Sequence, residues 1–353
     1  MARLVPLWGF GSGFVNPADE QFNDEIEPFM KKCATSGVTR LIPRLRLQEI
    51  VDIASKEGLE VHPQSTFNKH GGRPVYEWNL SFGGTYTDRE VLDRGRPVWA
   101  RPVPRPLSEF ADSHRDWWSK TRDGSNGLRQ GRFVEMSLGF PEVIEYEQEK
   151  FTSLITNPSF TGLEVEFAGT TVDESGTAAY GYEEPIVEAF QEEFGVSPYD
   201  IPNSDQDWVE FRGNFVTDFL RGLRSQVKKS NPSAAMTVAV PAREVNHYFS
   251  RLEQWPKWID EQLIDELHLW FRTVSDPSEV GRLTEDCVRK VDGRCSVVVE
   301  LSCFHPGSLQ TGTELINAAR DANEAGANAV GLYRAESVEQ LDLWSVVTEI
   351  AAM

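Results

Sequence analysis

Residues 161–169 read TGLEVEFAG, and this short stretch decides which fold is predicted. Leu163, Val165 and Phe167 alternate in it with Glu164 and Glu166. A period of two is typical of a β-strand and places both carboxylates on the same face. That face is either an ordinary solvated sheet surface or the inside of a closed barrel. Burial of an unpaired carboxylate inside a barrel costs several kcal/mol of free energy, so each acid there would need an ion-pair partner or a catalytic role.

Apolar runs with strand character recur on both sides of this stretch, and each is followed by helical spacing or by a long loop. Strands that alternate with helices form parallel sheets. Eight such units in 353 residues predict an α/β fold, a (β/α)₈ TIM barrel with long inserted loops after strands 3 and 4. An open doubly wound sheet is the alternative, but no G-x-G-x-x-G motif opens the first helix. The predicted strands cover 2–10, 39–45, 59–67, 162–167, 234–242, 264–271, 295–304 and 327–335.

No internal repeat or linker divides the chain, so we predict one domain over 1–353. The segment 68–131 is rich in Gly, Pro, Arg and Trp and is too long for a passive connection. We expect it to cover the active-site face. Helical spacing is strongest over 206–229, and further helices are predicted over 141–155 and from Pro185.

The chain is acidic, with 55 Asp and Glu residues against 35 Lys and Arg residues and a formal charge of −20. This balance argues against a nucleic-acid or anionic-membrane partner, since both attract a basic face. No apolar run approaches the roughly 20 residues of a membrane span, and the N-terminus has no signal-peptide pattern. We expect a cytoplasmic protein from the sequence as written, or a secreted one if a signal peptide has been removed. The oligomeric state is not predicted.

Four cysteines are present, Cys33, Cys287, Cys295 and Cys303. Their spacing does not match that of a metal site, and we predict no metal and no cofactor. One disulfide between Cys287 and Cys295 is the alternative to buried free thiols, which we favour.

In a closed barrel, the burial of Glu164 and Glu166 costs free energy unless each carboxylate is paired. The apolar residues of the opening stretch suit the helix side, so Glu164 and Glu166 are expected to point inward. Active sites of such barrels lie at the carboxyl ends of the strands, and Glu166 is nearer that end than Glu164. We therefore predict Glu166 as catalytic and Glu164 as the partner of an arginine, either Arg44 or Arg46.

Glu300 ends the seventh predicted strand and is the second catalytic candidate. Two carboxylates across a barrel mouth suit glycoside hydrolysis. In the large clan of retaining barrel glycosidases the acid/base ends strand four and the nucleophile ends strand seven, which by analogy assigns Glu166 and Glu300. Val165 stands where that clan usually has Asn. The alternative for Glu300 is a structural ion pair with Arg334.

Polar and aromatic side chains gather at the same predicted strand ends and in the segment 68–131. Flat rings stack on sugar faces, and polar groups bind sugar hydroxyls; the alternative for each ring is an anchor that packs a loop onto the barrel. Trp117 and Trp118 are the best candidates for a stacking platform, with Trp78 and Trp99 further along the same segment. The predicted substrate-binding residues are Trp8, Arg44, His62, Gln64, Glu164, Trp117, Trp118, His268, Trp270, Tyr333 and Arg334.

Two more carboxylates, Glu183 and Glu184, precede Pro185. They are secondary candidates for the mouth of the barrel. The alternative is that they complement the dipole of the following helix in its first turn.

Three stretches resemble one known family, glycosyl-hydrolase-like family ten. They read SLGFPEVIEYEQEKFTSLITNPSFTGLEVEF (137–167), YGYEEPIVEAFQEEFGVSPYDIPNSDQDWVEFRGNFVTDFLRGLR (180–224) and WPKWIDEQLIDELHLW (255–270). The resemblance implies a TIM-barrel glycosidase with a carbohydrate substrate, and fixes neither the sugar nor the stereochemistry. Glu166 stands where the family has Asp, and Thr161 precedes Gly162 where the family has Asp.

The sequence thus predicts a glycoside hydrolase that cleaves a poly- or oligosaccharide. One alternative is a metal-dependent sugar isomerase or epimerase, in which Glu166, His268 and Glu300 bind Mn²⁺, Mg²⁺ or Zn²⁺ with His62 or His305. The other alternative is a barrel that binds carbohydrate without catalysis.

Overall fold

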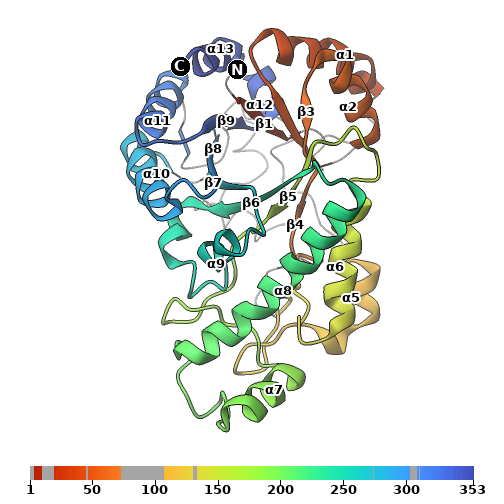
Figure 1. Ribbon diagram of the computed structural model, residues 1–353, viewed down its shortest axis with the longest axis vertical. Coiled ribbons are helices and arrows are strands. Elements are labelled where there is room, and N and C mark those ends of the chain that lie inside the picture. The colour runs from red at the N-terminus through yellow and green to blue at the C-terminus, as the bar shows by residue number, and fades with distance from the viewer. Residues whose placement is uncertain are drawn as a thin grey trace.

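The computed structural model describes residues 4–9, 20–44, 47–72, 107–129, 133–272, 274–302, 308–309 and 311–353. Within these residues nine parallel strands form one sheet in the order β3-β2-β1-β9-β8-β7-β6-β5-β4 (Figure 1). The strands are β1 (Pro6–Gly9), β2 (Arg40–Pro43), β3 (Glu60–Val61), β4 (Gln64–Thr66), β5 (Gly162–Glu166), β6 (Ala235–Pro241), β7 (Glu266–Phe271), β8 (Ser296–Ser302) and β9 (Ala329–Tyr333).

The two ends of this order, β3 and β4, are parts of one extended segment, the predicted strand 59–67. β3 pairs with β2, and β4 pairs with β5. Between them the His62 amide donates to the Leu41 carbonyl at 2.9 Å, and the Pro63 carbonyl accepts from the Glu164 amide at 2.9 Å. The segment therefore closes the sheet into a barrel of eight strands, which confirms the predicted (β/α)₈ fold. Pro63 has no N–H to donate, and it lies where the segment changes partners.

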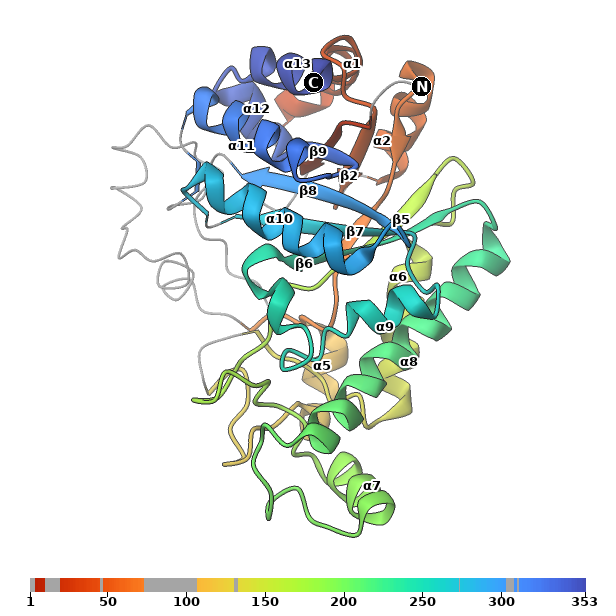
Figure 2. The same cartoon turned by 60° about the vertical axis from the view of Figure 1, so that its left-hand side comes forward.

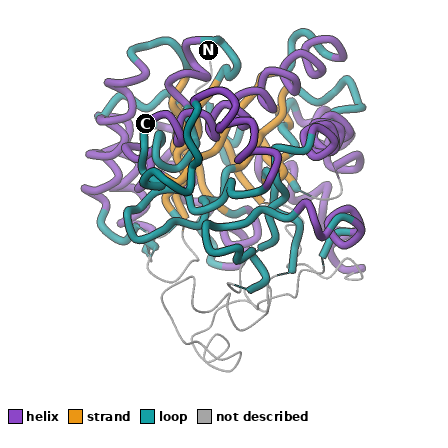
Figure 3. The backbone as a smooth tube through the Cα atoms, turned by 90° about the horizontal axis from the view of Figure 1, so that it is seen from below, coloured by secondary structure: helices purple, strands orange, loops and turns teal. Residues whose placement is uncertain are grey.

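Helices pack around the outside of the barrel, and Figure 3 shows them to the left, above and to the right of the strands. The predicted helices over 141–155, from Pro185 and over 206–229 are confirmed as α6, α7 and α8. The α-helices are α1 (Glu20–Thr35), α2 (Leu47–Ala54), α5 (Glu109–Ser113), α6 (Pro141–Ser153), α7 (Glu184–Phe194), α8 (Gln206–Ser230), α9 (Trp255–Asp260), α10 (Pro277–Val291), α11 (Gly312–Glu324), α12 (Ala335–Gln340) and α13 (Trp344–Ala352), and the 3₁₀ segments are η1 (Ser55–Glu57), η3 (Arg115–Trp117) and η4 (Ala242–His247).

The segments that follow β4 and β5 build a lobe beside the barrel. It contains α5, α7 and the first part of α8, at the bottom of Figures 1 and 2. The lobe has two apolar clusters of its own, one around Trp118 and Met136 and one around Tyr182, Phe190 and Trp208. These long connections are thus packed structure rather than passive loops in their described parts.

The main apolar core lies between the strands and the helices and includes Leu163, Val165 and Phe167. The apolar face of the TGLEVEFAG stretch therefore faces the helices, as predicted. A smaller apolar cluster with Trp8 and Tyr333 fills part of the barrel interior. The rest of the interior carries charged side chains, which form the site described below.

Several expectations concern the chain as a whole. In the described ranges no helix is long and apolar enough to span a membrane. Cys287 and Cys295 are free thiols, as is Cys33, so the alternative of a disulfide is wrong for this structure. Cys303 lies outside the described residues. The single domain over 1–353 and the position of 68–131 over the active-site face stay predictions.

Candidate active site at the carboxyl end of the barrel

Glu164 and Glu166 both point into the barrel and are 0% and 1% exposed. The Glu164 carboxylate accepts hydrogen bonds from Trp8 Nε1, at 3.1 and 3.3 Å to its two oxygens, and from Gln64 Nε2. It also forms an ion pair with His268 Nδ1. Arg44, one of the two arginines predicted to pair with Glu164, contacts Glu166 instead because of the stagger of the strands, and the other, Arg46, lies outside the described residues.

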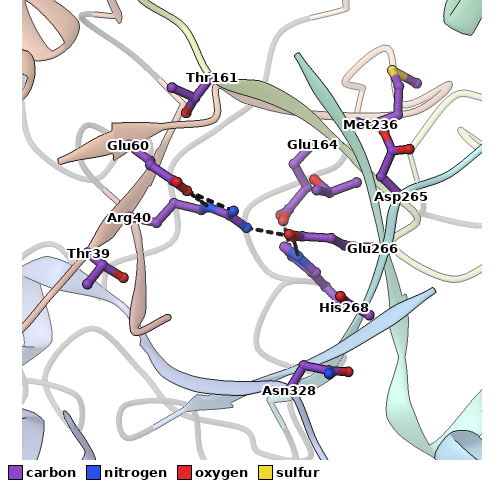
Figure 4. A network of polar contacts seen from close by, with 12 residues as sticks. Thr39, Arg40, Glu60, Thr161, Glu164, Met236, Asp265, Glu266, His268 and Asn328 are labelled. Carbon is purple, nitrogen blue, oxygen red and sulfur yellow. Dashed lines mark hydrogen bonds and ion pairs between the residues drawn. The ribbon is translucent and has the colours of Figure 1, made fainter. Parts of the chain in front are cut away.

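Below Glu164 a chain of ion pairs leads to the amino end of the barrel (Figure 4). His268 Nε2 lies 3.0 Å from Glu266 Oε2, which lies 2.5 Å from Arg40 Nη1. Arg40 Nε donates to Glu60 Oε2 at 2.8 Å, and the Glu60 side chain is 47% exposed. Burial lowers the pKa of His268, but the carboxylates of Glu164 and Glu266 outweigh burial and raise that pKa to about 9. His268 is therefore an imidazolium at neutral pH.

Above Glu164 the Glu166 carboxylate binds two guanidinium groups. Arg44 Nη2 contacts one oxygen and Arg272 Nη1 contacts the other, while Thr66 Oγ1 donates at 2.7 Å. Arg44 Nε also donates to Gln64 Oε1 at 2.6 Å, which joins this group to Glu164. Burial opposes ionisation of Glu166, but Arg272 and Arg44 outweigh it and hold the pKa well below its usual range.

Glu300 is fully buried and shares Arg272 with Glu166. Arg272 Nε donates to Glu300 Oε1 at 2.7 Å, and Nη2 donates to Oε2 at 3.3 Å. The sequence-based alternative named Arg334 as the partner, whereas the structure pairs Glu300 with Arg272. Burial raises the pKa of Glu300; Arg272 opposes this rise, and the Glu164 and Glu166 carboxylates add to it. The pKa values of the two predicted catalytic carboxylates are thus moved apart, as in many acid/base pairs.

Arg272, which sequence reasoning missed, follows the last residue of β7. Its guanidinium lies over the rings of Trp270 and Tyr333, at 4.8 and 4.4 Å from their centroids. Its side chain is 12% exposed, so it stands between the buried carboxylates and the mouth. The sequence does contain a signal for Arg272. The predicted strand 264–271 ends in Trp270-Phe271 and is followed by Arg272, an arrangement similar to Tyr333-Arg334 at the end of the last predicted strand.

The remaining predicted substrate-binding residues divide by exposure. Arg44, Trp117 and Trp270 keep part of their surface exposed. The others are less than one tenth exposed, namely Trp8, His62, Gln64, Glu164, Trp118, His268, Tyr333 and Arg334.

Of the two residues predicted to form a stacking platform, Trp117 and Trp118, only Trp117 keeps part of its surface exposed. Trp118 is 5% exposed, and its Nε1 donates to the Ala111 carbonyl at 2.7 Å, so it anchors the segment instead of offering a free face. Trp117 stays partly exposed and stacks on His114 and Phe140, with centroids 4.2 and 5.0 Å apart.

Glu183 and Glu184 differ in exposure. Glu184 is exposed in the first turn of α7, as expected of a carboxylate that complements a helix dipole. Glu183 is buried and accepts hydrogen bonds from the Lys120 amide and, at 3.1 Å, from Ser137 Oγ. Burial raises the pKa of Glu183 to about 7, although these donors oppose the rise.

The metal-site alternative rests on Glu166, His268 and Glu300. In the structure Arg272 binds both glutamates, and His268 is bound by Glu164 and Glu266. Among the described residues no group of three or more His, Cys, Asp or Glu side chains is placed to hold a metal ion. Four other residues named from the sequence, Arg46, Trp78, Trp99 and His305, lie outside the described ranges.

Several solved glycoside hydrolases share this fold. The glycoside hydrolase domain of PgaB (BpsB) from Bordetella bronchiseptica is 14% identical over 98% of this chain and 99% of that chain, with a TM-score of 0.66. A β-galactosidase from the Antarctic haloarchaeon Halorubrum lacusprofundi is 12% identical over 100% of this chain and 58% of that chain, with a TM-score of 0.63. An exo-β-N-acetylglucosaminidase from Vibrio harveyi is 9% identical over 99% of this chain and 54% of that chain, with a TM-score of 0.51.

At these identities the likeness establishes the fold alone, a TIM barrel of the type found in glycoside hydrolases. The chain spans nearly all of the Bordetella domain and a little over half of the other two proteins. No family model and no curated protein matches the chain. Membership of glycosyl-hydrolase-like family ten therefore stays a prediction.

Proposed function

We propose that this protein is a glycoside hydrolase that cleaves a poly- or oligosaccharide with Glu166 and Glu300. The observation that supports this most is that Arg272 joins two buried carboxylates at the carboxyl end of the barrel. Their pKa values are moved in opposite directions, and the fold is that of glycoside hydrolases. Such an enzyme needs one carboxylic acid and one carboxylate on either side of the scissile bond.

The electrostatics favour one division of roles. Glu166 is held ionised by Arg44 and Arg272, which suits a nucleophile or a base that activates water. Glu300 has only a share of Arg272 and a raised pKa, which suits the acid that protonates the departing oxygen. This division is the reverse of the one suggested by analogy with retaining barrel glycosidases.

Arg272 has a positioning role in this proposal. By binding both carboxylates it fixes their orientation, and by its charge it keeps Glu166 ionised beside a second acid. Arg44 and Thr66 hold the other oxygen of Glu166. The sugar would approach from the side where Arg44, Arg272 and Trp270 keep some exposure.

A screen against a panel of poly- and oligosaccharides tests the activity. Once a substrate is found, Glu166→Gln and Glu300→Gln are each expected to abolish hydrolysis while the protein stays folded. Glu147→Gln is the matched control, because Glu147 lies on α6 and is equally buried but binds Lys150 and His70. It should lose stability and keep activity. Full activity of both site variants would overturn the assignment.

The division of roles has its own test. A dinitrophenyl glycoside of the active sugar has a leaving group that needs no protonation, so it can be cleaved without a general acid. Glu300→Gln should cleave it at a rate close to that of the wild type, whereas Glu166→Gln should not. The opposite pattern would restore Glu166 as the acid.

A second candidate is a barrel that binds carbohydrate without catalysis. It is favoured by the way Arg272 occupies both carboxylates, which are at most 1% exposed. It predicts oligosaccharide binding without turnover, unchanged by Glu166→Gln. The same screen, read for binding as well as for products, distinguishes the two functions.

A further inference from the structure

A cavity lies beside the barrel mouth and is separate from the pair Glu166 and Glu300. Phe67 and Phe167, the residues directly after β4 and β5, contribute to its wall. Trp270 of the mouth donates through Nε1 to the Phe167 carbonyl at 3.2 Å. The cavity is therefore a neighbour of the mouth, reached from the lobe built by the segments after β4 and β5.

Much of the cavity wall is apolar. Besides the two phenylalanines, Leu138, Ile186 and Phe215 line it. Such a wall favours a ligand with an apolar body, because burial of apolar surface is the main source of binding free energy. The polar groups of the lining then decide which ligand is accepted.

Glu253 lines this cavity from the segment before α9 and is only 4% exposed. Within the described part of the chain its carboxylate makes no hydrogen bond and no ion pair at contact distance. A buried carboxylate without a partner costs several kcal/mol, so proteins rarely keep one without a reason. Glu253 is thus a buried carboxyl group that lines the cavity and has no ion-pair partner at contact distance among the described residues.

The three cations of the lining already have partners. Lys69 is paired with Glu135, and Arg251 lies 3.6 Å from Glu244, an acid just outside the lining. The third cation, Arg212, donates to main-chain carbonyls, among them those of Ala178 and Tyr180 at 2.7 and 2.6 Å. None of the three cations contacts the Glu253 carboxyl group directly, and Arg251 and Lys69 act on it only through their charge.

Glu183 is the other buried carboxylate of the lining. The Lys120 amide and Ser137 Oγ, which donate hydrogen bonds to it, are both neutral. The cavity thus combines apolar walls with two buried carboxylates that no cation contacts directly. This is the complement of an organic cation, since an ammonium group offers three donors and phenylalanine rings attract positive charge.

We propose that this cavity binds an ammonium group carried on an apolar stem, with Glu253 as its counter-ion. The stem packs against Phe67, Phe167 and Phe215, and the ammonium donates to the Glu253 carboxylate. The site is independent of the proposed hydrolysis, because neither Glu166 nor Glu300 lines the cavity.

Binding of an ammonium group is coupled to the loss of the Glu253 proton. In the empty cavity burial, and next the charge of Glu244, raise the pKa of Glu253 well above its usual range, against the opposing charges of Arg251 and Lys69. Glu135 also faces Glu253 and adds to the rise. An ammonium that binds to the carboxylate form must displace the proton of Glu253 into the buffer. Affinity should therefore increase as the pH rises, until the ligand itself loses its proton.

Calorimetry with benzylammonium chloride tests the proposal, and benzyl alcohol is the neutral probe of similar shape. At mildly alkaline pH we expect saturable binding of benzylammonium in the millimolar range or tighter, and at least about tenfold weaker binding of benzyl alcohol. Titrations in buffers of different ionisation enthalpy should show that protons are released on binding.

Glu253→Gln should fold at least as stably as the wild type, since it removes a buried ionisable group. It should bind benzylammonium at least about tenfold more weakly and release no proton, with little change for benzyl alcohol. Glu279→Gln, a partly exposed acid that is paired with Arg243 and does not line the cavity, is the control and should bind like the wild type. The proposal is overturned by a lack of benzylammonium binding, by equal affinity for both probes, or by unchanged binding in Glu253→Gln.

Discussion

At the scale of single residues, His268 makes the stability of the barrel depend on pH. Glu164 and Glu266 raise its pKa from 6.5 to about 9 against the effect of burial. A raised folded-state pKa gives a stabilising contribution that is complete below the unfolded-state pKa and is lost as the pH rises through the folded-state pKa. The size of the shift corresponds to about 3 kcal/mol. We therefore predict that the free energy of unfolding falls between slightly acid and mildly alkaline pH.

Urea unfolding at a series of pH values measures this loss. In His268→Gln the same series should be flatter, because the group that titrates has been removed and the other groups titrate in both proteins. The difference in unfolding free energy between wild type and variant should shrink as the pH rises. Parallel curves for the two proteins would show that His268 does not carry this pH dependence.

Residue-scale reasoning from the sequence predicted Glu166 and Glu300 as the catalytic pair but did not predict Arg272, the partner that they share. Alternation along one strand tells which way a side chain points, because the period is local. The partner across a barrel depends on the stagger between strands, which no local pattern contains. Arg44 therefore meets Glu166 instead of Glu164, and Arg272 was overlooked because it lies just past the end of β7.

At the scale of elements, β5 depends on a residue without a side chain. Gly162 lies at the start of the strand, and a Cβ atom there would be 2.5 Å from the imidazole of His62. His62 is 1% exposed, so it has no space into which to retreat. We predict that Gly162→Ala lowers the free energy of unfolding by about 1–3 kcal/mol, the usual cost of overpacking.

Urea unfolding of Gly162→Ala, His62→Ala and the double variant tests this contact as a cycle. The double variant should be more stable than the sum of the two single effects predicts, because each change makes room for the other. Additive effects, or a Gly162→Ala protein as stable as the wild type, would contradict the close approach of Gly162 and His62.

The elements themselves were largely predictable from the sequence. Each predicted strand is present, since short apolar runs between turn residues mark parallel strands without tertiary information. The exception is the segment 59–67, which the structure divides into β3 and β4. Pro63 in its middle lacks the donor for a continuous ladder, and this signal could have been used.

At the scale of the whole molecule, the buried charges form one connected series through the barrel. Four of its carboxylates are matched by four cations, and the fifth carboxylate, Glu300, only shares a cation. Burial, together with this shared cation, gives a physical reason for the raised pKa of Glu300 and for the proton that we assign to it; Glu60, at the amino end of the series, is partly exposed. From the amino end to the mouth the series runs Glu60, Arg40, Glu266, His268, Glu164, Gln64, Arg44, Glu166, Arg272 and Glu300.

The surface, in contrast, is far from balanced, since the chain carries a formal charge of −20. Repulsion between exposed carboxylates destabilises the compact state, and salt weakens it by shortening the screening length from about 30 Å at 0.01 M to about 8 Å at 0.15 M. The buried series is screened much less. We predict that the melting temperature rises by several degrees over this range of sodium chloride concentration.

Scanning calorimetry at increasing salt measures the rise, and a variant with fewer exposed acids provides the control. Glu188, Glu192 and Glu193 are exposed on α7. Replacing all three by Gln changes the formal charge from −20 to −17, since each substitution removes one negative charge. This variant should melt higher than the wild type at low salt and respond less to added salt. A melting temperature that falls with salt in the wild type would mean that exposed ion pairs, such as Arg221 with Glu261, outweigh the net repulsion.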